Sequence, residues 1–138
     1  MPRNPFDAYQ DVERATLTGR GLEAMVLNKA VAMLQNVLNR WDEPDHEALL
    51  EEALRYNQRL WTFFQVELSA DDNPLPRALR ENLLSLSVFV DNRTFELMTN
   101  PAPEKLDILI TINKNIAAGL RDQAADTTNF GSLTFVSG

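Results

Sequence analysis

The chain has 138 residues, of which 44% are hydrophobic and 24% are charged, and these values are typical of one globular domain with its own core. Because the chain contains no cysteine, disulfides and thiolate metal sites are excluded. The formal net charge of −7 opposes the phosphate neutralisation that drives most nucleic-acid binding. The composition therefore favours a protein partner over a nucleic acid.

The amino terminus, which reads Met-Pro-Arg-Asn-Pro-Phe-Asp, lacks the apolar core and the cleavage site of a signal peptide. The chain also has no run of about eighteen apolar residues, the length of a membrane-spanning helix. We therefore expect a cytoplasmic protein with no membrane partner. Within residues 1–17, a weak helical pattern of Phe6, Tyr9, Val12 and Leu17 predicts a short helix or an arm laid across the rest of the domain.

The first long helix is expected from 19 to 41, with Thr18 as its N-cap. Its apolar residues form two adjoining stripes that together cover more than half of the helix circumference. The first stripe contains Leu22, Met25 or Val26, Ala30, Met33 and Val37, and the second contains Leu27, Val31, Leu34 and Leu38. A central helix contacted on two sides explains this pattern. The alternative is that part of the second stripe stays open for a partner.

The second long helix is expected from 45 to 69, with Pro44 at its first helical position, where a missing N–H is tolerated. Its aromatic residues make it the segment around which the other helices pack, since burying one Phe side chain is worth roughly 1.5–3 kcal/mol. We expect Trp61 to be mostly buried and structural. Asn57 falls on the same apolar stripe, where an amide without partners costs about 1–3 kcal/mol.

A proline-containing turn then leads to a third helix, expected from 76 to 98. Its main apolar stripe consists of Leu79, Leu83, Leu86 and Val90. Two further apolar residues, Leu84 and Val88, lie beside this stripe. A last helix is expected over 103–121, with capping groups from Asn100 and Glu104 and a C-cap at Gly119. This helix carries a second amide, Asn113, on its apolar face.

These elements predict an all-α, single-domain bundle of four main helices, preceded by the short amino-terminal helix or arm and followed by a non-helical tail. The helical domain is expected over 1–125 and the tail over 126–138. Tail residues such as Phe130 and Phe135 are too apolar for a typical solvated end. We therefore expect the tail to dock on this chain or to support self-association.

A search for catalytic chemistry finds one histidine, no cysteine and no glycine-rich phosphate loop. His46 lies in the first turn of the second helix beside acidic residues, where a solvated cap residue is a better interpretation than a base or a metal ligand, because a metal site needs several convergent ligands. We therefore expect no enzymatic activity, no cofactor and no metal site.

Four blocks of the sequence carry a family resemblance through their order and spacing. They are Asn57-Gln58-Arg59-Leu60-Trp61, then Asn73 to Leu75 with Pro76 and Arg80, then Leu84-Ser85-Leu86-Ser87, and finally Ile110 to Ile116 with Gly119-Leu120. In these blocks the chain resembles the flagellar biosynthesis regulator FlaF of alphaproteobacteria. The resemblance covers roughly residues 8–121 and leaves the tail unmatched.

The resemblance implies an all-helical cytoplasmic protein that is needed for flagellin production, binds flagellin before export and works alongside the regulator FlbT. An amphipathic client helix would lie in a groove between helices, and the partner-binding residues that we predict are Leu27, Val31, Leu34, Leu38 and Val88. The alternatives are a post-transcriptional regulator that acts on mRNA directly and a scaffold between FlbT and flagellin. Direct RNA binding is disfavoured, because Arg77 and Arg80 form only a small basic spot.

Overall fold

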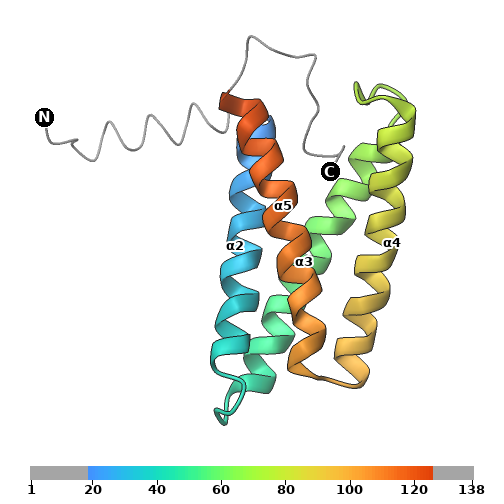
Figure 1. Cartoon of the computed structure of the whole chain (residues 1–138). Helices are drawn as coiled ribbons and strands as arrows, with labels where there is room; N and C mark the ends of the chain where they lie inside the picture. Colours follow the sequence, from blue (N-terminus) through green and yellow to red (C-terminus); the bar gives the residue numbers. More distant parts are fainter. Residues whose placement is uncertain (1–18, 126–138) are drawn as a thin grey trace, which may run out of the picture.

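The computed structural model describes residues 19–125, and its regular elements in this range are all helical (Figure 1). They are four α-helices and a short 3-10 helix: α2 (Gly19–Asn39), α3 (His46–Ser69), α4 (Arg77–Thr99), η1 (Pro103–Lys105) and α5 (Leu106–Ala125). The predicted all-α bundle of four main helices is therefore confirmed. The expected amino-terminal arm, the N-cap at Thr18 and the tail over 126–138 lie outside the described residues.

The four helices are packed unequally around one another (Figure 1). Helix α2 packs against α5 and α3, and α3 runs obliquely from α2 to α4. Helix α4 packs mainly on α3 and meets α5 much less. The interpretation of the first long helix as one contacted on two sides is confirmed, and α4 is the helix that packs least extensively on the others.

Trp61 lies at the centre of the core, as predicted, with only 1% of its surface exposed. Its ring meets the edge of Phe64, with centroids 5.6 Å apart and ring planes at 87°, an arrangement that aromatic pairs favour. The buried residues of all four helices gather around this pair in one cluster. The aromatic segment of α3 therefore positions the rest of the bundle.

A chain of three buried polar side chains joins α3 to α5. Trp61 Nε1 donates to Asn113 Oδ1 at 3.0 Å, and Asn113 Nδ2 donates to Asn57 Oδ1 at 2.7 Å. Both amides have 0% exposure, and among the polar atoms of these three side chains only Nδ2 of Asn57 lacks a partner in the described part of the chain. The expectation that both amides need partners is confirmed, and they find those partners in each other.

The turn predicted between the second and third helices is also present, and one asparagine stabilises it. Asn73 Nδ2 donates to the carbonyl oxygen of Glu67 at 2.9 Å, and Asn73 Oδ1 accepts from the backbone N–H of Leu75 at 3.0 Å. The side chain thereby satisfies a carbonyl at the end of α3 and closes a local turn.

Three details of the predicted helix ends are wrong. Pro44 precedes α3, which begins at His46, because residues 40–45 first form a run of turns closed by backbone bonds such as Glu43 N–H to the carbonyl of Arg40. Asn100 caps the end of α4, and η1 has no side-chain cap. Gly119 is buried inside α5, which continues to Ala125; without a side chain it fits the packed interior and does not end the helix.

The central position of Trp61 generates the first prediction. Replacing Trp61 by Ala should lower the free energy of unfolding by about 3–5 kcal/mol, because it leaves a cavity and orphans the amide of Asn113. Urea denaturation followed by circular dichroism measures this change. Trp41→Ala is the matched control, since Trp41 is only partly buried and should cost less. Equal losses for the two tryptophans would contradict the core assignment.

Candidate functional site

The structure separates the five predicted partner-binding residues. Leu27 and Leu34 have 0% exposure, so these two predicted residues are core residues and not part of an open surface. The physical reason is that α3 and α5 both pack on α2 and cover this part of its second stripe. Val31 and Leu38 are partly buried against the core. Val88 on α4 is the exposed member of the set, with 56% of its surface accessible.

Val88 belongs to a longer open stripe along α4, which we call the α4 stripe. Its members recur at alternating intervals of four and three residues and are Leu84, Val88, Asp91, Phe95 and Met98. Phe95 is 67% exposed and Met98 is 45% exposed, whereas Leu84 and Asp91 are partly buried. This spacing places all five on one face of the helix.

The buried face of α4 has the same spacing, one residue earlier in the chain. It consists of Leu83, Ser87, Val90, Thr94 and Leu97, each at most 8% exposed. Helix α4 therefore carries two adjacent seams, of which one is packed in the bundle and the other is open. Surplus apolar surface of this kind marks an interaction site more often than it marks a stable free surface.

The α4 stripe borders a groove between α4 and α3. Gln65 of α3 donates to Asp91 at 2.8 Å, which ties the middle of the stripe to the neighbouring helix. At the Met98 end the groove encloses about 420 Å³, and its further lining comprises Leu50, Leu54, Leu97 and Pro101 with the charged residues Glu47, Glu51 and Arg55. The α3–α4 groove thus has an apolar floor and a charged rim.

Sequence reasoning found Val88 and Leu84 but missed Phe95 and Met98, the most exposed part of the stripe together with Val88. The sequence contains a pattern that could have revealed them: Phe95 follows Val88 by seven residues, and Met98 follows Asp91 by seven, as Asp91 follows Leu84. The sequence analysis assigned α4 one main apolar stripe with two residues beside it. It therefore did not distinguish the buried face of the helix from the parallel α4 stripe.

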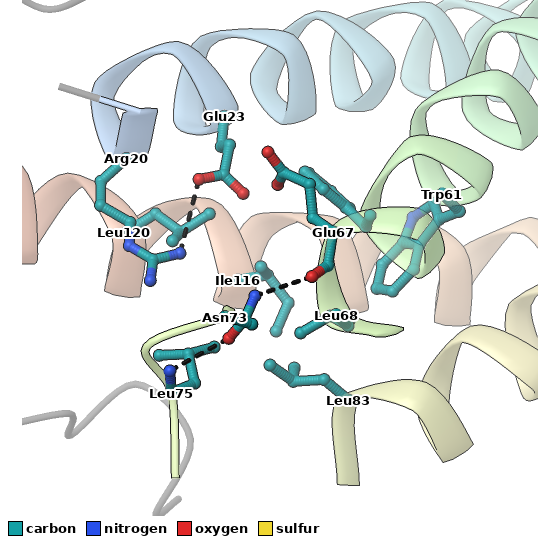
Figure 2. A pocket seen from close by; sticks show the side chains of 11 residues that line it. Arg20, Glu23, Trp61, Glu67, Leu68, Asn73, Leu75, Leu83, Ile116 and Leu120 are labelled. Atoms are coloured by element: carbon teal, nitrogen blue, oxygen red, sulfur yellow. Dashed lines mark hydrogen bonds and ion pairs between the residues drawn. The ribbon is translucent and has the colours of Figure 1, made fainter. Parts of the chain in front are cut away.

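A second, smaller site lies at the end of the bundle where α2 begins and α3 ends (Figure 2). This end pocket encloses about 40 Å³ and is lined by the apolar residues Trp61, Phe64, Leu68, Leu75, Leu83, Ile116 and Leu120, and by Arg20, Glu23, Glu67 and Asn73. Binding sites for drug-sized ligands have about 300–1,000 Å³. The end pocket has room for little more than water or part of one side chain.

Glu23 is the unusual group of the end pocket. Burial raises the pKa of its carboxyl from 4.5 to about 7, although Arg20, 3.4 Å away, lowers this pKa, and the nearby carboxylate of Glu67 raises it. Figure 2 shows the two carboxyl groups directed toward each other across the pocket. Near neutral pH, the carboxyl group of Glu23 is therefore partly protonated, whereas an exposed glutamate is ionised at this pH.

Other sequence features have structural roles. His46 Nδ1 lies 2.9 Å from the carbonyl oxygen of Glu43, and its ring lies 5.2 Å from that of Trp41, so His46 belongs to the α2–α3 turn. Arg77 pairs with Glu81 at 2.9 Å, which neutralises part of the small basic spot. In residues 19–125, no cluster of three potential metal ligands is present, and no helix has both the length and the apolar character for crossing a bilayer.

The raised pKa of Glu23 predicts how stability depends on pH. The folded state binds this proton more tightly than the unfolded state, so the stabilisation is complete below pH 4.5 and is lost as the pH rises toward and above 7. Glu23→Gln should therefore gain stability relative to the parent between pH 4.5 and pH 8, by at most about 3 kcal/mol. Urea denaturation at several pH values measures the difference. The exposed Glu52→Gln variant is the control and should stay within about 0.5 kcal/mol throughout; a pH-independent difference for Glu23→Gln would contradict the prediction.

The geometry places an open apolar stripe on an acidic helical bundle, and comparison with known proteins relates that bundle to a family. Searches among curated proteins and among solved structures find no match. The family model described as flagellar protein FlaF matches residues 5–120, which include all four blocks that carry the sequence resemblance and the whole α4 stripe. Because this match spans most of the chain, the protein belongs to the FlaF family of flagellar proteins.

Proposed function

We propose that this protein binds flagellin in the cytoplasm and holds it for export, acting as a chaperone or adaptor and without enzymatic activity. The observation that carries the proposal is the open α4 stripe beside the α3–α4 groove. Family membership supports a flagellar role, and the stripe supports a role in binding a protein. The sequence resemblance supplies flagellin as the client.

The spacing of the stripe suits a helical client. An amphipathic helix docks in a groove through apolar residues at positions i, i+3 or i+4, and i+7, and Val88, Phe95 and Met98 offer a complementary row about 15 Å long. Asp91 lies within this row, and Glu47 and Glu51 lie at its rim. A client helix with a basic residue among its apolar positions would complement this surface, because it would pair with Asp91 during burial.

Direct action on mRNA has weaker support. The net charge of −7 repels phosphates, and the basic residues of the predicted spot have protein partners: Arg77 binds Glu81, and Arg80 donates to the carbonyl oxygen of Ala70 at 3.4 Å. The α4 stripe would suit the binding of FlbT by a scaffold protein as well as the binding of flagellin by a chaperone. The two proteins are therefore tested side by side.

Phe95→Glu is the decisive variant. Phe95 is 67% exposed, so the substitution should change the free energy of unfolding by no more than about 0.5 kcal/mol. It places a charge in the proposed contact, and capture of purified flagellin should weaken at least about tenfold, which corresponds to about 1.4 kcal/mol. Isothermal titration calorimetry measures the affinity, and circular dichroism verifies the fold.

Met25→Glu is the matched control, because Met25 is also an exposed apolar residue, at 42%, but lies on α2. This variant should bind flagellin like the parent. If Phe95→Glu also binds with the parent's affinity, the α4 stripe is not the flagellin site. If the parent binds FlbT or flagellin mRNA but no flagellin in the same assay, the chaperone proposal is wrong.

A further inference from the structure

A second groove lies on the other side of α3, between α3 and α2. We call it the α2–α3 groove; it encloses about 380 Å³, and its apolar lining is Leu22 and Val26 from α2 with Tyr56, Leu60 and Phe63 from α3. Leu22 is 43% exposed and Phe63 is 54% exposed. The groove lies near the end of the bundle where α2 begins, since Leu22 is three residues from Gly19.

The charges along this groove change sign from one end to the other. Helices α2 and α3 are antiparallel, so Glu23 and Glu67 border the end where α2 begins. Arg59 borders the other end, and Lys29 lies close to it, with its Nζ 5.0 Å from the centre of the Tyr56 ring. Arg59 is exposed and has no ion-pair partner among the described residues. A segment that fits the groove should be basic near Gly19 and acidic farther along.

We propose that the amino-terminal segment of this chain, residues 5–18, lies in the α2–α3 groove and runs antiparallel to α2. The segment joins α2 at Gly19, and its apolar residues are Phe6, Tyr9, Val12 and Leu17. Arg14 would then meet Glu67 at the acidic end. Asp7 and Asp11, farther from Gly19, would meet Arg59 and Lys29 at the basic end.

The length of the segment suffices for this path. From Leu22 to Lys29 the groove follows seven residues of α2, about 10 Å. The fourteen residues of the segment span about 21 Å as a helix and more when extended, so the segment covers the groove in either conformation. The family match begins at residue 5, so the match includes this segment.

The carboxyl-terminal residues 126–138 are a poorer occupant of the same groove. They contain one charged residue, Asp126, and no basic residue, so they offer no partner for the acidic end. They also lie beyond the family match, which ends at residue 120. The order of charges, together with the point of attachment at Gly19, therefore selects the amino-terminal segment.

The absence of cysteine from the full chain allows a direct test by cross-linking. The first double variant, Asp7→Cys with Arg59→Cys, places one thiol on the segment and one at the basic end of the groove. The second, Arg14→Cys with Glu67→Cys, tests the acidic end. Asp7→Cys with Glu96→Cys is the control, because Glu96 is exposed on α4, outside the groove. Each variant is treated with a short bis-maleimide, and circular dichroism verifies its fold.

Both groove pairs should cross-link within the monomer at least about tenfold faster than the control pair, because docking raises the effective concentration of the two thiols. Equal rates for groove and control pairs would overturn the proposal. Cross-linked dimers would overturn it as well and would identify a second copy of the chain as the occupant. The readout is independent of flagellin, so it does not depend on the function proposed above.

Discussion

The buried chain from Trp61 through Asn113 to Asn57 is the interaction on which the rest of the fold depends. These hydrogen bonds lie in the interior, where an unpaired amide is costly, and they connect residues more than fifty positions apart. An apolar contact between α3 and α5 would tolerate sliding by one turn, whereas these three side chains meet in a single register. Helix α5 packs most extensively on α2, so the hydrogen-bonded chain ties the α2–α5 pair to α3 in that register.

With α2, α3 and α5 joined in this way, α4 is left at the edge of the bundle. It buries one narrow seam against α3 and meets α5 only to a small extent, so Val88, Phe95 and Met98 of its second seam remain exposed. Hydrogen bonds from Gln65 to Asp91 and from Arg80 to the carbonyl oxygen of Ala70 tie α4 to α3 and to the preceding turn without covering these three residues. An exposed, regularly spaced apolar row on an otherwise acidic helical protein is the physical basis for proposing that the protein binds a helical client.

Helix α3 divides the surface into two grooves of different character. The α3–α4 groove is mainly bordered by acidic residues with an apolar row on one helix, which suits a partner that brings basic charge. The α2–α3 groove has charges of opposite sign at its two ends, which suits a segment with a defined direction. Beside its acidic end, Glu23 shares a proton-sensitive pocket with Glu67, so the ionisation of Glu23 changes the charge that a docked segment would encounter.

The amino-acid sequence by itself determined the four long helices within residues 19–125 and the approximate positions of their limits, because prolines, asparagines and apolar periodicity act locally; it did not determine the capping residues. It also determined that Trp61 is buried and that Asn57 and Asn113 need partners, since their chemistry permits few other solutions. Only the tertiary structure decided which apolar stripe stays open: periodicity shows that a helix has two apolar faces, but the number of neighbours decides whether both are covered. For this reason Leu27 and Leu34 are buried while Phe95 is exposed. The pKa of Glu23 likewise depends on burial and on Glu67, forty-four residues away in the chain, and Gly119 is buried inside α5, which continues to Ala125.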